Sequence, residues 1–335
     1  MSDQYNYFRS PEALRVGILL WQIFPPILIV FGTIGNVLSI IILSKNKFKN
    51  STSTVFLLGL AAVDLSMLYV GLLRQWLKYT FDFDIRHVSA LFCKVHWWLM
   101  YVMSDCTVWI LNAITIERLI ATMCPHKSKR ICSKKFAICS VVAILATSLL
   151  INCNLLYGFG NVEISDGNRT TILLCVPIND KYANFFGTVW TWIDLCKFSL
   201  IPFGIMATGN ICIGFKLFLS KKKVYPTAVA GDRMVRKGIA SNMTILLVLL
   251  NFVFIFCTLP VCVYFIGEPY WIPKDLPREI QLQDPWWALV NIMLYANSTT
   301  NFILYCLTGS RFRDEVRRVF RRRAQAVTST ASRDM

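Results

Sequence analysis

The chain has 335 residues, of which 55% are hydrophobic and only 16% are charged, and its formal net charge is +16. Soluble globular domains carry about 25% charged residues, so this composition excludes an ordinary water-soluble protein. The charge alone would suit nucleic-acid binding, but the basic residues fall in short gaps between long apolar runs rather than on one soluble face. We therefore expect a membrane protein with no nucleic-acid partner.

Seven apolar segments are long enough to cross a bilayer, which takes roughly 20 residues per helix. Runs of this length exceed a barrel strand, and backbone groups in lipid must be hydrogen-bonded internally. The sequence therefore predicts an all-α membrane protein, with one domain formed by a seven-transmembrane helix bundle. The helices are expected at about residues 16–44, 52–76, 90–123, 136–159, 183–219, 236–267 and 285–308.

Basic residues are distributed unevenly over the gaps between these helices. The gaps after helices 1, 3 and 5, together with the C-terminal tail, hold 24 of the 35 Lys and Arg residues. Because cytoplasmic loops are enriched in Lys and Arg, this asymmetry predicts an extracellular N-terminus and a cytoplasmic C-terminus. The first apolar run lacks a small-residue cleavage pattern and is expected to stay in the mature chain.

Two covalent modifications follow from this topology. Of twelve cysteines, only Cys93 and Cys175 fall on the oxidising outer side, which predicts one disulfide between the start of helix 3 and the loop after helix 4. The Asn-x-Ser/Thr pattern occurs four times, and only Asn168 lies in an outer loop, so glycosylation is predicted there. Cys124 and Cys306 lie near the inner face, where they are either acylated or ordinary free thiols.

The segment after helix 7 has the spacing of an amphipathic helix over residues 309–323. Phe312, Val316, Val319 and Phe320 share one face, and arginines occupy the other. Such a helix is expected to lie on the inner leaflet and to bind anionic membrane lipid. Residues 324–335 are expected to form a tail without regular structure.

Asp64 is an acidic residue in the middle of helix 2, where a charge needs polar partners. Candidate partners on other helices are Asn36, Thr107, Asn297 and Asn301. Oxygen ligands of this kind suit Na⁺, although the same residues could form a purely structural polar network. No other cofactor or metal is predicted, and the chain lacks HExxH, P-loop and GxSxG patterns, so an enzyme is not expected.

Short motifs occur in order along the chain, one set per helix: Gly35-Asn36, Leu60 to Asp64, Cys93, Glu117-Arg118-Leu119, Pro202, Cys257 to Pro260, Asn301 to Tyr305 and Arg311 to Arg313. In this respect the sequence resembles the rhodopsin-like (class A) G-protein-coupled receptors over residues 15 to 323. Residues 117 to 135 are similar to invertebrate neuropeptide receptors of the FMRFamide type. The resemblance implies a plasma-membrane receptor that binds an extracellular ligand, with a peptide preferred, and activates a heterotrimeric G protein.

The resemblance also implies roles for particular residues. Asp64 and its partners would hold an allosteric sodium ion in the inactive state. Glu117 and Arg118 would form an ionic latch that opens toward the G protein, with the carboxylate as a bidentate partner; an ordinary interfacial ion pair is the alternative. The remaining switch positions would be Pro202, Pro260 and Tyr305.

Four positions depart from the family pattern, which places the common switch mechanism in doubt more than the fold. They are Leu119, Asn210, Thr258 and Phe302. Since Phe302 replaces a proline, the end of helix 7 is expected to be straighter, whereas Pro202 and Pro260 should still kink helices 5 and 6.

The ligand site is narrowed by two exclusions drawn from the resemblance. No lysine lies between residues 285 and 310, which disfavours retinal, and Met100 occupies the position of the aminergic aspartate, which disfavours monoamines. Nine of the ten tryptophans lie in the outer half, either as an interfacial belt or as the lining of a ligand vestibule. The candidate ligand-binding residues are Met100, Asp105, Asp194, Lys197, Trp97, Tyr101, Trp190, Tyr264, Trp287 and Tyr295.

Among these candidates, Lys197 is expected to pair with either Asp105 or Asp194, which would leave the other carboxylate for a cation on the ligand. A cluster whose charges satisfy one another completely is the alternative. Acidic residues in the outer loops would favour cationic ligands in the same way.

Two other functional classes remain compatible with the residues. A transporter or channel would be expected to show an internal repeat with helices broken at corresponding positions, and the sequence has none that we detect. A protein with the receptor fold but without G-protein signalling is compatible with the departures at Thr258 and Phe302.

Overall fold

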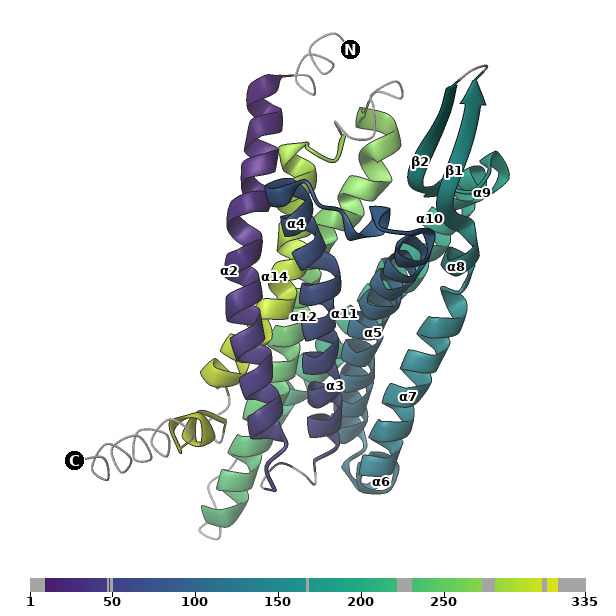
Figure 1. Ribbon diagram of the computed structural model, residues 1–335. Coiled ribbons are helices and arrows are strands. Elements are labelled where there is room, and N and C mark those ends of the chain that lie inside the picture. The colour runs from purple at the N-terminus through teal and green to yellow at the C-terminus, as the bar shows by residue number, and fades with distance from the viewer. Residues whose placement is uncertain are drawn as a thin grey trace, which may run out of the picture.

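The computed structural model describes residues 10–46, 48, 51–166, 169–221, 231–272, 281–308 and 312–318. Within these ranges, seven long helical segments run roughly side by side as a bundle (Figure 1). They are α2 (Pro11–Leu43); α3 (Thr52–Ser66) with η1 (Met67–Leu72) and α4 (Leu73–Phe81); α5 (Ala90–Met123); α7 (Lys134–Ile151) with α8 (Asn154–Gly158); α9 (Asp180–Asn184) with η3 (Phe185–Trp190), α10 (Thr191–Leu195), η4 (Cys196–Leu200) and α11 (Ile201–Lys221); α12 (Gly231–Trp271); and α14 (Pro285–Thr308).

Six of the seven segments are long and apolar enough to span a membrane. The seventh, α14, has 24 residues and carries Asn291, Asn297 and Asn301, which lower its mean hydropathy. All three asparagines are buried against the rest of the bundle. The predicted all-α bundle of seven membrane helices is therefore confirmed.

The helices extend beyond the apolar runs on which the sequence-based boundaries depended. α2 begins at Pro11 rather than near residue 16, with the proline in the first turn, where its missing N–H matters least. The second segment continues to Phe81 rather than residue 76, and α12 continues to Trp271. A hydropathy pattern does not detect these helix ends, because the last turns contain polar residues and extend beyond the hydrocarbon layer of the membrane.

The second and fifth segments contain π-helical turns that no sequence pattern predicts. They are η1 in the second segment, and η3 and η4 in the fifth. Pro202 is the second residue of α11, and the carbonyl four residues earlier, with which its ring would collide, belongs to η4, so the wider turn accommodates the proline. By contrast, α12 stays α-helical through Pro260, and α14 is uninterrupted at Phe302.

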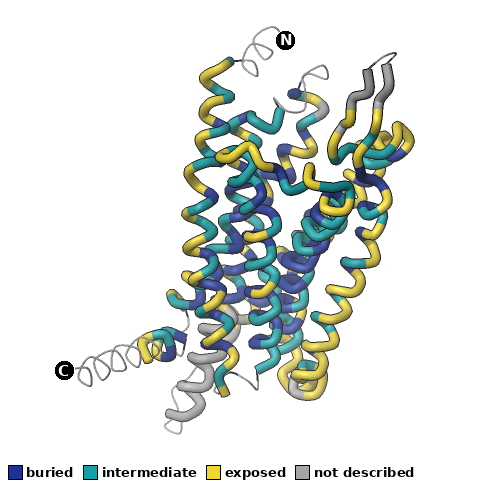
Figure 2. Tube along the Cα trace, in the orientation of Figure 1, coloured by how far each residue is buried: buried dark blue, intermediate teal, exposed yellow. Residues whose placement is uncertain are grey.

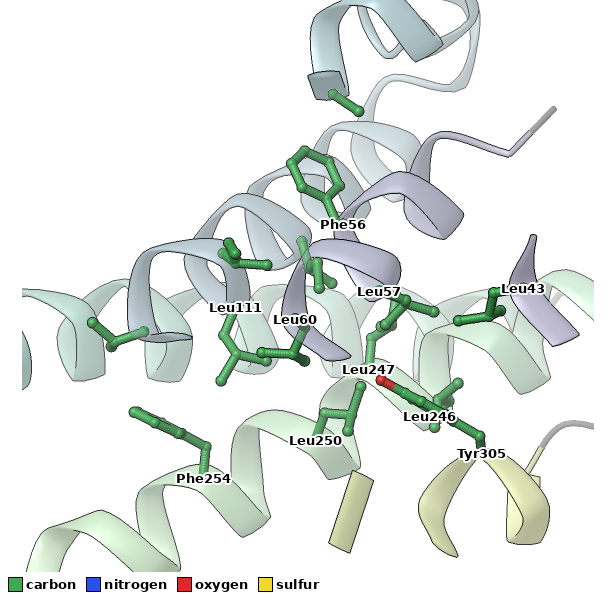
Figure 3. Close-up of a cluster of buried hydrophobic side chains, with 14 of the residues drawn as sticks. Leu43, Phe56, Leu57, Leu60, Leu111, Leu246, Leu247, Leu250, Phe254 and Tyr305 are labelled. Atoms are coloured by element: carbon green, nitrogen blue, oxygen red, sulfur yellow. The ribbon is translucent and has the colours of Figure 1, made fainter. Parts of the chain in front are cut away.

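The apolar core lies between α3, α5, α12 and α14. Figure 3 shows Phe56 and Leu60 of α3 near Leu111 of α5, with Leu250 and Phe254 of α12 on the other side. Leu111 is the most exposed of these five residues, at only 2%. The outer surface of the bundle is also apolar. Exposed residues lie along the length of its helices (Figure 2), and many of them are large hydrophobic residues. A surface of this kind suits contact with lipid rather than water.

A two-stranded antiparallel sheet stands beyond the end of the bundle, between α8 and α9 (Figure 1). It consists of β1 (Phe159–Asp166) and β2 (Arg169–Pro177), and its register shifts between Gly160 and Val162. Opposite this bulge, Cys175 has φ 56°, and its N–H donates to Asn161 Oδ1 at 3.2 Å. We call this end of the bundle, with β1, β2 and η2 (Ile85–His87), the hairpin end. The predicted glycosylation residue, Asn168, lies outside the described residues.

The opposite end carries α6 (Pro125–Ile131) and a short helix over residues 312–318, and we call it the α6 end. Phe312 is buried and its ring lies 5.6 Å from that of Tyr305, whereas Arg317 and Arg318 are exposed. The described part of the predicted 309–323 helix is therefore amphipathic. Val319 and Phe320, which the prediction also placed on the apolar face, lie outside the described residues, as do residues 324–335.

Candidate functional site

A disulfide between Cys93 and Cys175 joins β2 to the first turn of α5, as predicted. Around it, Cys93, Leu155, Phe159 and Tyr182 form a small apolar cluster. The bond and this cluster together hold the hairpin against the bundle. They place the aromatic residues of β1 directly beside those of α5.

Aromatic rings from α5, β1 and the fifth segment meet beneath the hairpin. The ring centroid of Trp97 lies 4.7 Å from that of Phe159, and the centroid of Tyr101 lies 6.2 Å from that of Trp190. Lys197 Nζ is 5.4 Å from the Tyr101 ring centroid and 5.6 Å from that of Trp190. Four of the predicted ligand residues, Trp97, Tyr101, Trp190 and Lys197, are therefore brought together, and Lys197 adds Asp105 and Asp194 to the group.

Lys197 contacts two carboxylates at once. Its Nζ lies 2.8 Å from Asp105 Oδ1 and 2.7 Å from Asp194 Oδ1. Asp105 Oδ2 also accepts a hydrogen bond from Asn152 Nδ2 at 2.7 Å. The expectation that one carboxylate stays free for a ligand is therefore wrong, because a lysine side chain on η4 can reach both α5 and the preceding turn of its own helix.

A second aromatic group lies on α12 and α14. The ring centroids of Tyr264 and Trp287 are 5.4 Å apart, and the Tyr264 hydroxyl lies 3.3 Å from Asp284 Oδ2. Burial raises the pKa of Asp284, which also accepts hydrogen bonds from backbone N–H groups at the start of α14. Tyr295 of α14 is buried, and Gly71 of η1 leaves space for its ring and for Met100. The ten candidates thus form two groups, and Met100 of α5 belongs with Tyr295 and Trp287 of α14.

A polar cluster at the hairpin end was not predicted. Arg74 of α4 binds Asp84 through two nitrogens: its Nε lies 2.8 Å from Oδ1, and its Nη2 contacts Oδ2. Burial by itself raises the pKa of Asp84, but the hydrogen bond and charge of Arg74 outweigh this and hold it well below its ordinary value. Arg86 of η2 stacks on Trp97, with its Cζ 4.0 Å from the ring centroid. Charged residues in a loop are usually exposed to solvent, so the sequence offers no reason to expect a buried cluster. The inward direction of Asp84 and Arg86 depends on the conformation of this loop.

Asp64 lies at mid-height of the bundle and is completely buried. Its Oδ2 accepts a hydrogen bond from Asn301 Nδ2 at 2.6 Å, and the Ser298 side chain also lies beside the carboxylate, while Oδ1 has no hydrogen-bond partner within the described residues. Asn297 is also buried nearby on α14, whereas Thr107 donates its hydroxyl hydrogen to Met103 O at 3.1 Å. An unpartnered buried carboxylate oxygen fits a small hard cation, and Asp64, with the side chains of Asn297 and Asn301, would hold Na⁺ there.

At the α6 end, Glu117 and Arg118 meet Ser53 of α3. The Ser53 hydroxyl lies 2.9 Å from Glu117 Oε2, and Arg118 Nη2 contacts Ser53 Oγ and lies 3.3 Å from Glu117 Oε1. One guanidinium nitrogen makes these contacts, so the pairing is not the bidentate one expected. Ser53 was missed because a serine at the start of a helix more often acts as a local cap.

The departures from the family pattern have new partners. Asn251 Nδ2 lies 3.1 Å from Asn210 Oδ1 and 2.7 Å from Thr115 Oγ1, which links α12 to α11 and α5. Thr258 is fully buried and donates to Phe254 O at 2.6 Å. The Tyr305 hydroxyl, by contrast, is buried without a hydrogen-bond partner in the described part of the chain. Polar contacts thus replace the aromatic residues that the resemblance would place at positions 210 and 258.

Seven membrane helices, the disulfide and the Glu117–Arg118 pair define a membrane receptor of the rhodopsin class. Over residues 35–305 the sequence matches the family "7 transmembrane receptor (rhodopsin family)", and the chain belongs to this family. It is therefore a multi-pass membrane protein and a G-protein-coupled receptor by family. The transporter or channel alternative is set aside by this assignment.

Relatives within the family have different ligands in their names. Galanin receptor 2a of Danio rerio is 26% identical over 331 residues, which cover 95% of this chain and 82% of the relative. An FMRFamide peptide receptor of Caenorhabditis elegans is 24% identical over 297 residues, which cover 86% of this chain and 66% of the relative. Cysteinyl leukotriene receptor 2 of Sus scrofa is 23% identical over 309 residues, which cover 88% and 80%.

Proposed function

We propose that this chain is a plasma-membrane receptor for an extracellular peptide and that it activates a heterotrimeric G protein. Its hairpin end and N-terminus would face outside, and its α6 end and C-terminus would face the cytoplasm. The distribution of Lys and Arg supports this orientation. The disulfide at the hairpin end supports it too, because disulfides persist in oxidising surroundings.

The observation that carries a peptide ligand is the hairpin. Each strand of the two-stranded sheet has one neighbour and one outer edge, and the sheet stands beside the aromatic residues of α5. An extended peptide can add its backbone to such an edge, whereas a lipid cannot. The names of the galanin and FMRFamide receptors support the same ligand class, and that of the leukotriene receptor supports a lipid mediator instead.

A ligand screen decides between these two classes. Cells that express the full chain would be exposed to amidated and free-acid peptides and, separately, to cysteinyl leukotrienes, with reporters for several G-protein types. We expect responses to peptides alone. A response confined to leukotrienes would contradict the peptide proposal.

Signalling is expected to depend on Arg118. Arg118→Ala should abolish the agonist response while leaving surface expression intact, because it removes the cation proposed to meet the G protein. The matched control is Arg130→Ala, which changes an exposed arginine on α6 at the same end. If Arg118→Ala signals normally, the chain has the receptor fold but a different coupling mechanism.

We also propose that Na⁺ binds at Asp64 and stabilises the inactive bundle. The support is the unpartnered buried oxygen of this carboxylate. Replacing choline chloride with NaCl should raise the melting temperature of the purified receptor, since a bound ion stabilises by about 1.4 kcal/mol at tenfold excess over its Kd. Asp64→Asn should remove the difference between the two salts, and an equal response in both proteins would exclude the site.

A further inference from the structure

One cation at the hairpin end, Arg86, lacks an acidic partner. The cluster contains two guanidinium groups, those of Arg74 and Arg86, but only one carboxylate, that of Asp84. Arg74 occupies both oxygens of that carboxylate. Arg86 reaches Asp84 only through its backbone N–H, at 3.0 Å from Oδ1, and forms no ion pair with any acidic side chain among the described residues. The cluster therefore retains one uncompensated positive charge.

The neighbours of the Arg86 side chain are neutral. Its Nε donates to His96 Nδ1 at 2.9 Å, and His96 Nε2 lies 2.7 Å from Val70 O. Because Nδ1 accepts and Nε2 must therefore donate, His96 is the neutral Nε2–H tautomer. The flat face of the guanidinium rests on the Trp97 ring. Nε is thus satisfied, while no described protein acceptor meets Nη1 or Nη2.

The surroundings of Arg86 also have more hydrogen-bond donors than acceptors. Nε1 of Trp97, the ring on which Arg86 lies, is buried without an acceptor among the described residues, and so is Nε1 of Trp190, which lies beside Tyr101. Desolvation by burial lowers the pKa of Arg86 to about 9, so the group remains cationic at neutral pH, and the Tyr101 and Tyr295 hydroxyls lie near enough to act on its charge. A guanidinium with a free pair of nitrogens, set on an aromatic ring, is the geometry that binds a carboxylate through two parallel hydrogen bonds.

Resting on the proposed peptide ligand, we infer that Arg86 is the anchor for a carboxylate of that ligand, held by Nη1 and Nη2 above the Trp97 ring. This reverses the ligand charge suggested by the acidic loops. Asp105 and Asp194 share the single cation Lys197, and neither carboxylate forms an ion pair or hydrogen bond with Arg86 among the described residues. The carboxylate would come from an acidic side chain or from a free peptide C-terminus.

A binding test that needs no activation uses benzoate as the probe and benzamide as its neutral counterpart. Thermal unfolding of the purified full-length receptor would be followed with each compound at constant ionic strength. We expect benzoate to raise the melting temperature more than benzamide does. Arg86→Gln should remove this difference, Arg86→Lys should retain part of it, and Arg15→Gln, at an exposed arginine of α2 at the same end, should leave it unchanged.

Two results of the binding test would overturn the inference. One is equal stabilisation of the unmodified receptor by benzoate and benzamide, which does not depend on any variant folding. The other is a benzoate effect that persists in Arg86→Gln.

A signalling test distinguishes the source of the carboxylate. Matched peptide pools would carry Glu or Gln, each with a free or an amidated C-terminus. Arg86→Gln is expected to weaken the response to the active acidic pool at least tenfold. The control variant Arg15→Gln is expected to respond like the unmodified receptor. Equal potency of the amidated Gln pool would contradict the inference alone, whereas silence toward every pool would contradict the peptide proposal and leave the thermal test to decide on Arg86.

Discussion

Lys197 Nζ lies between two carboxylates, 2.8 Å from Asp105 and 2.7 Å from Asp194. The side chains of Lys197 and Asp105 are 12% and 4% exposed, whereas that of Asp194 is 30% exposed. Because buried charges are costly unless paired, the lysine is the member of this group on which the other two depend most.

Lys197→Met should therefore destabilise the receptor more than either acidic substitution. It leaves two neighbouring carboxylates without a cation, and loss of one partner of a buried pair costs about 3–5 kcal/mol. Asp105→Asn should cost less, and Asp194→Asn least, since water can reach that carboxylate. Melting temperatures of the three purified variants test this order, with Lys216→Gln, at an exposed position of α11, as the control. A melting temperature for Lys197→Met equal to that of the control would refute it.

Removal of the disulfide should destabilise the hairpin end. Cys93 and Cys175 are 82 residues apart in sequence, and loss of a native disulfide typically costs about 2–5 kcal/mol. We expect Cys93→Ser, Cys175→Ser and the double variant to lose similar amounts of surface expression and agonist response. Non-additive losses are the signature of one shared bond. Cys153→Ser, which removes an exposed free thiol, serves as the control.

Acid should weaken the Arg74–Asp84 pair. Since the pKa of Asp84 is held below its ordinary value in the folded protein, the stabilisation is complete above about pH 4, the ordinary Asp range, and is lost as the pH falls further. Asp84→Asn should lower stability at neutral pH by about 3–5 kcal/mol and flatten the acid dependence of the melting temperature. Asp180→Asn, at an exposed position of α9, should keep the acid dependence of the unmodified receptor.

Loss of the Glu117 charge should raise basal signalling. Glu117 holds both Ser53 and Arg118, and hydrogen bonds to charged groups contribute about 1.5–3 kcal/mol. Glu117→Gln is therefore expected to increase agonist-free reporter activity about tenfold at equal surface expression, because about 1.4 kcal/mol shifts a two-state equilibrium by that factor. Ser53→Ala should act in the same direction but less strongly. Unchanged basal activity in Glu117→Gln would show that the pair is an ordinary interfacial contact.

Apolar runs and the basic loops were sufficient to predict the bundle, since seven membrane helices leave few alternatives. The same topology predicted the Cys93–Cys175 bond, because it left only two cysteines on one side. The partners of individual side chains were harder to predict. Whether Lys197 pairs with one carboxylate or with two depends on the position of its helical turn relative to Asp105 and Asp194. The inward turn of Arg86 depends on a loop conformation that no hydrophobic period encodes. The contact of Ser53 with Glu117 and Arg118 could not be predicted, because a serine hydroxyl is uncharged and common at the start of a helix.

The π-helical turns η1, η3 and η4 have a consequence for how this receptor could diversify. Each wide turn accommodates one residue more than an α-helical turn does, and one residue corresponds to about 100° of rotation around the axis. Deleting or inserting a residue within η1 or η4 would therefore re-aim every side chain between that turn and the hairpin end while leaving Asp64 and the Glu117–Arg118 pair in place. Ligand preference could change by a single codon gain or loss, independently of the coupling end.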